Sequence, residues 1–175
     1  MNLYIMRHAQ AGVARPNPVL DRKRGLVKEG KEQCLQMAQI LNALNLQFDL
    51  VASSPLKRAL QTAQLMATET GYEQKLLITP ALAPEASFAD FEAMLAQNPT
   101  AENILVVGHN PNLQSFLTQL IGRDCKSNVR LRKGTIARVE LTRRPGTLNW
   151  LLDPRLVRAF YSSVTKSSRR KTSAK

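Results

Sequence analysis

Asn2-Leu3-Tyr4-Ile5-Met6-Arg7-His8-Ala9 places an arginine and a histidine at the end of an apolar run. A second segment, Ile104-Leu105-Val106-Val107-Gly108-His109-Asn110-Pro111, repeats this arrangement with the other of the chain's two histidines. Short apolar runs bounded by breaking residues are typical of buried strands in a parallel sheet. Because open α/β sheets bind ligands at the carboxyl ends of their strands, we expect His8 and His109 to meet over one crevice.

Apolar spacing and capping residues predict four helices, over residues 29–44, 55–70, 87–97 and 111–121. In the first helix, apolar side chains recur at helical spacing and would form one buried face: Cys34, Met37, Ala38, Leu41 and Leu44. Ser54-Pro55 offers an N-cap serine before a proline at the first helical position, and Asn110-Pro111 repeats that pattern. Ser87 and Asp90 have the spacing of a capping box.

Between these helices the sequence predicts short strands and, near its end, a hairpin of 135–141 with 148–152. Strands that alternate with helices are typical of α/β proteins with a parallel sheet. We therefore expect a three-layer α/β/α domain over residues 1–160, whose mostly parallel sheet carries an antiparallel element. The segment 11–28 holds two glycines and two prolines among basic residues, so we expect a mobile loop over the site.

The chain is basic, with a formal net charge of +12. Five of the basic residues lie in the last ten positions, and the remainder still carries +7. A basic surface indicates an anionic partner rather than a particular activity. We expect residues 161–175, rich in Ser, Thr, Lys and Arg, to be a disordered tail. A weak nucleic-acid contact through this tail is one alternative, although neither a known binding module nor an aromatic stacking platform accompanies it.

Several classes of protein are disfavoured by the sequence. No apolar run approaches the roughly 18–20 residues that a membrane span needs, and the N-terminus lacks the pattern of a signal peptide. We therefore expect a cytoplasmic protein without membrane contact. Cys34 and Cys125 are too few for a disulfide framework, and the two distant histidines do not complete a zinc site. The sequence predicts no metal and no cofactor.

Four residues at comparable positions suit phosphoryl transfer: Arg7, His8, Arg58 and His109. A neutral imidazole at His8 can attack phosphorus and form a phosphohistidine, which splits one difficult transfer into two easier ones. The guanidinium groups of Arg7 and Arg58 match the equatorial phosphoryl oxygens. His109, kept protonated by the bound dianion, would add a donor where charge develops.

A structural role is the competing interpretation of each residue. A single histidine after a strand is more often a hydrogen-bonded structural residue than a catalyst, and either arginine could pair with a surface carboxylate. The convergence of both histidines on strand ends, each close to the start of a helix, favours a functional site.

These residues lie in motifs that resemble those of the histidine phosphatase superfamily, which includes the cofactor-dependent phosphoglycerate mutases. Arg7-His8-Ala9 is similar to the family's Arg-His-Gly, and Leu26-Val27-Lys28-Glu29-Gly30 resembles L-T-x-x-G. The segment 53–63 is similar to S-S-P-x-x-R-A-x-x-T-A, and Val107-Gly108-His109-Asn110 resembles V-x-H-x. The resemblance spans about residues 1–155. It implies a phosphoglycerate mutase-like fold, transient phosphorylation of His8, and a phosphate pocket of Arg7, Arg58 and His109 with Asn110 beside it.

Within the superfamily the chain most resembles the small SixA-type protein phosphohistidine phosphatases. The resemblance rests on overall shortness, the V-G-H-N-P form of the second-histidine motif, and Leu82-Ala83-Pro84. Mutases and many small-molecule phosphatases carry a glutamate as general acid where Pro84 stands, and Glu85 is an adjacent candidate for that role. An imidazole leaves phosphorus with less protonation than an alkoxide needs. The resemblance therefore implies a phosphohistidine-containing protein domain as substrate, in phosphorelay signalling.

Three other functions stay open at this point. A phosphatase of small phosphomonoesters would use Glu85 as its acid. A mutase is disfavoured because the usual glutamate and a larger lid are missing. A regulatory pseudoenzyme is the third, because Ala9 stands where glycine is usual and alanine is costly if that position needs a positive φ.

Overall fold

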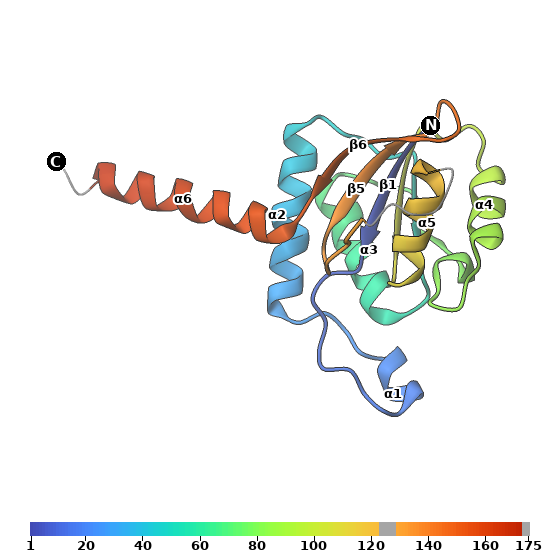
Figure 1. Cartoon of the computed structure of the whole chain (residues 1–175). Coiled ribbons are helices and arrows are strands. Elements are labelled where there is room, and N and C mark those ends of the chain that lie inside the picture. Colours follow the sequence, from blue (N-terminus) through green and yellow to red (C-terminus); the bar gives the residue numbers. More distant parts are fainter. Residues whose placement is uncertain (123–128, 173–175) are drawn as a thin grey trace.

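The computed structural model describes residues 1–122 and 129–172, with a six-stranded sheet between two layers of helices (Figure 1). The strand order is β3-β2-β4-β1-β5-β6. β1 (Asn2–Arg7), β2 (Leu50–Ser53), β3 (Leu77–Ile78) and β4 (Asn103–Gly108) are parallel. β5 (Ile136–Glu140) and β6 (Thr147–Leu152) form the antiparallel part. The predicted α/β fold with its antiparallel element is confirmed.

Both faces of the sheet are covered, as the apolar strand sequences predict. Successive residues of a strand point to opposite faces, so Tyr4 and Met6 pack with α2 (Lys28–Ala43) and α3 (Lys57–Glu69). Leu3 and Ile5 pack on the other side with α4 (Phe88–Ala96) and α5 (Asn112–Ile121). A short 3-10 helix, η1 (Pro80–Leu82), follows β3. The predicted buried face of α2 is correct except at Leu44, which follows the helix and is 53% exposed.

The register of the parallel strands brings the chemically important segments to one edge of the sheet. Arg7 pairs with Gly108, and Ser53 pairs with Val107. Beyond the strands, the backbone N–H of His8 donates to the Gly108 carbonyl at 3.0 Å. The residues that follow β1, β2 and β4 therefore lie side by side.

The segment 11–28 is more ordered than the predicted mobile loop. It contains helix α1 (Pro18–Arg22), and the Asn17 side chain caps it by accepting from the backbone N–H groups of Val19 and Leu20. A backbone bridge joins Ala11 to Leu26 at the base of the segment. Asn17-Pro18 at the start of α1 is a local capping signal of the same kind as Asn110-Pro111, so it is consistent with a helix here.

Two predicted helix starts are wrong, for one physical reason. α3 begins at Lys57 and α5 at Asn112, and neither start has a side-chain cap. The Ser54 hydroxyl instead contacts His109, and the Asn110 side chain donates to the Leu131 carbonyl. These tertiary contacts orient the two side chains: the Ser54 oxygen accepts from the backbone N–H of Leu56, ahead of α3, and Oδ1 of Asn110 is left without a partner among the described residues. Neither side chain therefore caps the first turn of its helix. The capping box of Ser87 with Asp90 is confirmed at the start of α4.

The predicted disordered tail also differs from the structure. Helix α6 (Pro154–Thr172) covers most of residues 161–175 and runs outward from the body (Figure 1). Asp153 accepts from the backbone N–H of Arg155 at the helix start, and Val157 is buried against the core on the α2 side. Lysine and arginine are good helix formers, so a helix anchored at one end can continue through a basic segment. Residues 173–175 and Cys125 lie outside the described residues.

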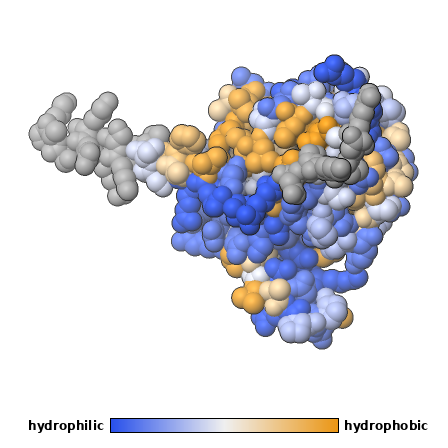
Figure 2. Space-filling model, in the orientation of Figure 1, coloured by the Kyte–Doolittle hydropathy of each residue, from blue (hydrophilic) through white to orange (hydrophobic). Residues whose placement is uncertain are grey.

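Apolar residues gather on one face over β5 and β6, above a more hydrophilic lower part of the molecule (Figure 2). Half-buried side chains of β6 contribute to the two cores: Leu148, Trp150, Leu151 and Leu152. Cys34 is fully buried on α2, and burial raises the pKa of its thiol to about 12. Within the ranges that the structure describes, no helix is long and apolar enough to cross a membrane.

Candidate active site

A cavity of about 430 Å³ at the carboxyl edge of the sheet brings together the four residues that the sequence singled out. Its lining includes all of them and the adjacent amide: Arg7, His8, Arg58, His109 and Asn110. They come from the end of β1, the first turn of α3 and the segment after β4. The predicted convergence of the two histidines is therefore present in the structure.

The environment of His8 suits a nucleophile. The residue is 4% exposed, and its ring Nδ1 lies 2.8 Å from the carbonyl oxygen of Ala9. A carbonyl oxygen only accepts hydrogen bonds, so Nδ1 carries the proton and Nε2 keeps its lone pair. Burial lowers the pKa of His8 from 6.5 to about 3, and the positive charges of Arg58 and Arg7 act in the same direction. The ring is therefore neutral near pH 7.

His109 is held by a different contact. Its Nε2 lies 2.9 Å from the hydroxyl oxygen of Ser54, and its buried Nδ1 has no hydrogen-bond partner among the described residues. Burial is the main cause that lowers the pKa of His109 to about 3, and the neighbouring His8, Arg58 and Arg7 also lower it. His109 is thus neutral without a bound anion, and the expected protonated form would need the charge of a ligand.

The two predicted arginines are cations with unused donors, and Arg58 is the buried one of the two. Arg58 is 7% exposed, and its Nη1 donates to the backbone carbonyl and the carboxylate of Asp21 at 3.1 and 3.2 Å. Nη1 of Arg7 donates to the Leu131 carbonyl at 3.0 Å. Nε of each arginine is buried without a partner in the described chain. Such donors around a cavity suit a tetrahedral oxyanion.

Two further cations and one carboxylate were missed by sequence reasoning. Arg24 and Lys133 also line the cavity. Asp21 accepts from Nε of Arg24 at 2.9 Å and thereby links Arg24 to Arg58. Burial and the charges of Arg7, Arg24 and Arg58 lower the pKa of Lys133. The signal for Lys133 was the basic run 130–133, whereas nothing local connects Asp21 with α3.

The structure does not bring Glu85 into the cavity. Its carboxylate lies 3.6 Å from Nη2 of Arg22, and the two side chains are 68% and 69% exposed. Pro84 lines the catalytic cavity, while Glu85 lines a separate hollow beside α4. No aspartate or glutamate is among the described residues that line the catalytic cavity.

Ala9 and Gly30 end the motifs 7–9 and 26–30, and their surroundings show how these two segments pack together. Ala9 is fully buried, its N–H donates to the hydroxyl of Thr62 at 3.1 Å, and it is not among the described non-glycine residues with positive φ. Alanine therefore brings no left-handed strain at this position. A Cβ on Gly30 would lie 2.0 Å from the carbonyl oxygen of Gln10. Only glycine lets α2 approach the backbone that follows His8 this closely.

Comparisons with known proteins agree with this geometry. Residues 3–98 match the family model described as "Histidine phosphatase superfamily (branch 1)". An uncharacterized protein of Picosynechococcus sp. is 32% identical over 139 residues, which are 78% of this chain and 82% of that protein. The structure of the protein histidine phosphatase SixA complexed with tungstate has a TM-score of 0.80 at 25% identity, over 90% of this chain and 99% of that one. The alpha-ribazole phosphatase from Shigella flexneri has a TM-score of 0.71 at 20% identity, over 88% and 97%, and shows the shared fold.

Proposed function

The chain belongs to the histidine phosphatase superfamily, and from that premise we propose that it removes phosphate from phosphohistidine in a protein substrate. The observation that carries this choice is the absence of a carboxylate among the described residues that line the catalytic cavity. A phosphomonoester must expel an alkoxide, which needs a general acid, whereas the conjugate acid of a leaving imidazole has a pKa near 6.5. Asp21, which contacts Arg58, cannot serve as this general acid, because hydrogen bonds from Arg15 and Arg24 lower its pKa and keep it ionised.

His8 is the proposed nucleophile. Its Nε2 lone pair attacks phosphorus, a new P–N bond forms, and the bond from phosphorus to the substrate ring breaks with its electron pair on that ring. The substrate ring carries a proton on its other nitrogen, so it leaves as a neutral imidazole. Water then attacks the phosphorylated His8, which releases inorganic phosphate and restores the neutral imidazole. The Ala9 carbonyl holds the proton on Nδ1 throughout and so keeps Nε2 directed as the reacting atom.

Positive donors would stabilise the transferring group. Arg7 and Arg58 each keep a buried, unpaired Nε beside the cavity. The Ser54 hydroxyl already accepts from the backbone N–H of Leu56, and we assign its own proton to Nε2 of His109. That assignment leaves the proton of His109 on the unpaired Nδ1, where it can be donated to a phosphoryl oxygen.

Similarity to known structures supports the same substrate class. The SixA structure shares the fold over nearly its whole length. The cavity is also open at the surface, with Arg7, Gln10, Asn110 and Lys133 shared with an adjoining groove. An open cavity can admit a phosphohistidine that projects from a folded protein, whereas a small metabolite benefits from enclosure.

The test is incubation with a histidine-phosphorylated protein domain, following phosphate release and acid-labile label on the enzyme. We expect wild type to release phosphate through a transient label, and His8→Ala to lose the label and about a thousandfold or more of the rate. Circular dichroism checks that the variant is folded. Full activity of His8→Ala would refute the proposed nucleophile.

A phosphatase of small phosphomonoesters is the second candidate, supported by the shared fold of the alpha-ribazole phosphatase from Shigella flexneri. Comparing kcat/KM for a sugar phosphate with that for the phosphorylated domain separates the two. Glu85→Gln gives an independent test, because Glu85 was the only acid that the sequence suggested. We expect this variant to keep phosphohistidine turnover within about twofold, since exposed Glu85 contacts Arg22 outside the cavity.

A further inference from the structure

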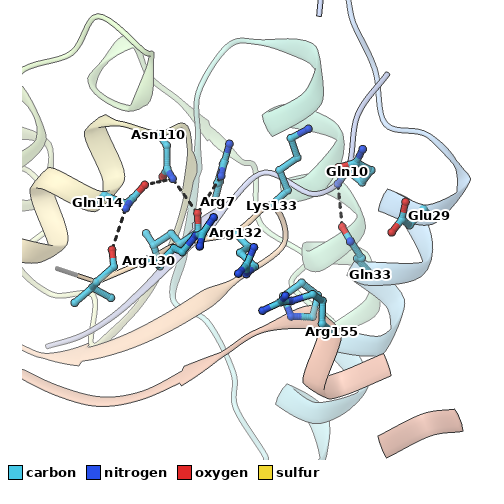
Figure 3. Close-up of a pocket in the computed structure, with 13 residues that line it drawn as sticks. Arg7, Gln10, Glu29, Gln33, Asn110, Gln114, Arg130, Arg132, Lys133 and Arg155 are labelled. Atoms are coloured by element: carbon cyan, nitrogen blue, oxygen red, sulfur yellow. Dashed lines mark hydrogen bonds between the residues drawn. The ribbon is translucent and has the colours of Figure 1, made fainter. Parts of the chain in front are cut away.

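A second, larger hollow adjoins the catalytic cavity. Its volume is about 760 Å³, and it shares Arg7, Gln10, Asn110 and Lys133 with that cavity. Figure 3 shows that it lies between the segment 129–133 on one side and Gln10, Gln33 and Glu29 on the other. Arg155, at the start of α6, also borders it. A substrate held at His8 would therefore extend into this hollow, which we call the basic groove.

Positive charge dominates the basic groove. Among the described residues that line it, Glu29 is the single carboxylate and five side chains are cationic: Arg7, Arg130, Arg132, Lys133 and Arg155. Asp153 partly offsets two of them, with an oxygen 3.2 Å from Arg132 and 3.1 Å from Arg155. Arg130 is exposed and has no ion pair within the described parts of the chain. The groove thus offers uncompensated charge beside the catalytic cavity.

Hydrogen bonds from catalytic elements fix the segment that carries this charge. Arg7 and Asn110 both donate to the Leu131 carbonyl, at 3.0 and 2.8 Å, and Gln114 donates to the Val129 carbonyl at 3.0 Å. The Leu131 side chain is buried. The backbone that carries the cations on either side of Leu131 is therefore held next to the reacting groups, and binding does not have to order this segment.

We propose that the basic groove docks an acidic segment of the substrate protein, close in sequence or space to its phosphohistidine. This inference rests on the proposed function and deepens it. Arg130 and Arg155 are exposed at the rim, where charges steer a protein partner and set its orientation. Nucleic acid fits less well, because no aromatic residue is among the described residues that line the groove to stack on a base.

Two matched phosphohistidine peptides test the proposal, one with Asp and Glu flanking the phosphohistidine and the other with Asn and Gln. The groove variant is Arg130→Gln with Arg155→Gln. The control is Lys75→Gln with Arg143→Gln, which removes the same charge from two exposed positions. Both lie near the amino ends of the parallel strands, away from the groove at their carboxyl ends. We expect wild type and control to favour the acidic peptide roughly tenfold in kcat/KM, and the groove variant to lose that preference.

The neutral peptide should be hydrolysed equally by all three proteins, and 0.5 M NaCl should reduce the preference for the acidic one. Equal kcat/KM for both peptides in wild type would overturn the proposal, as would an equal loss in the control variant. Slower turnover of the neutral peptide by the groove variant would also overturn it, because the groove would then act in catalysis itself.

Binding without turnover separates failure of docking from failure of the proposed function. Fluorescence anisotropy with the unphosphorylated acidic and neutral peptides should show tighter binding of the acidic one by wild type and control, but not by the groove variant. If this pattern appears while neither phosphopeptide is hydrolysed, docking stands and the proposed function fails. Tighter binding of single-stranded DNA than of the acidic peptide, through Arg130 and Arg155 at the same salt, would overturn docking in favour of a nucleic-acid site.

Discussion

The ring centroids of His8 and His109 lie 5.1 Å apart, with the ring planes inclined at 54°. This proximity follows from the pairing of β1 with β4, in which Arg7 is opposite Gly108. Two imidazoles this close, among several guanidinium groups, disfavour a positive charge on either ring. A phosphoryl dianion between them supplies the opposite charge. Under the proposed function, the same buried site keeps His8 neutral for attack and lets His109 donate once the substrate is bound.

Arg58→Lys should lower kcat/KM for phosphohistidine by roughly a hundredfold while the protein stays folded. Lysine keeps the charge but cannot contact Asp21 and a phosphoryl oxygen with a planar fork, as the guanidinium can. Steady-state kinetics on both substrate classes measures the effect. The control is Arg22→Lys, an exposed substitution on α1 that should leave the rate unchanged. Similar losses in both variants would argue against a specific role of Arg58.

Ser54→Ala should reduce kcat by about tenfold with a small effect on stability, because His109 loses the partner that fixes its orientation. Ser53→Ala is the matched control. Its hydroxyl is equally buried but donates to the Ser54 carbonyl at 2.9 Å, and no contact with His109 involves it. We expect Ser53→Ala to keep near-normal kcat at a comparable cost in unfolding free energy. Loss of kcat in Ser53→Ala alone would contradict the assigned role of Ser54.

Gly30→Ala should destabilise the fold by about 2 kcal/mol or more and lower activity, because the new methyl group would overlap the Gln10 carbonyl two residues after His8. Urea unfolding and kcat/KM measure the two effects. Gly12→Ala is a control for stability, since its Cβ would meet only the flexible Arg24 side chain, at 3.7 Å. A Gly30→Ala protein as stable as wild type would show that α2 can move away without cost.

Stability should fall as the pH drops below about 6.5. In the unfolded chain His8 and His109 bind protons near that pH, whereas burial holds both pKa values at about 3 in the folded protein. The neutral rings therefore contribute stability that is present above pH 6.5 and is lost between pH 6.5 and 3. At pH 5 the loss is about 2 kcal/mol per histidine. The midpoints of urea unfolding at pH 7 and at pH 5 should differ less in His8→Asn and in His109→Asn than in wild type. Identical midpoints at the two pH values in wild type would contradict the lowered pKa values.

Local patterns predicted the parts of the site that depend on strand ends. The apolar run 2–6 is typical of a buried strand, so the residues directly after it were expected at an edge of the sheet. The same argument placed His109, and the helix periodicity after Ser53-Ser54-Pro55 placed Arg58 in a first turn. These inferences needed no contact between distant segments, because the residues that follow a parallel strand lie at the carboxyl edge of the sheet whatever the register of the strands.

Positions that depend on a tertiary partner could not be predicted in this way. Ser54 and Asn110 look like helix caps locally, yet their side chains bind His109 and the Leu131 carbonyl. Glu85 lies one residue from the usual place of the acid, but the loop turns it outward to Arg22. For these polar groups, several partners have similar energies, and the packed structure decides among them.

The sequence by itself thus determined the α/β class, the convergence of Arg7, His8, Arg58 and His109, and the histidine phosphatase motifs. Only the tertiary structure decided which nitrogen of His8 is free, which residue holds His109, and that the basic segment 129–133 continues the catalytic cavity as a groove. The physical reason is the separation along the chain over which each kind of interaction acts. Apolar periodicity acts within a few residues and is written in the chain, whereas hydrogen-bond partners and the summed field of the cations arise only when distant segments pack together.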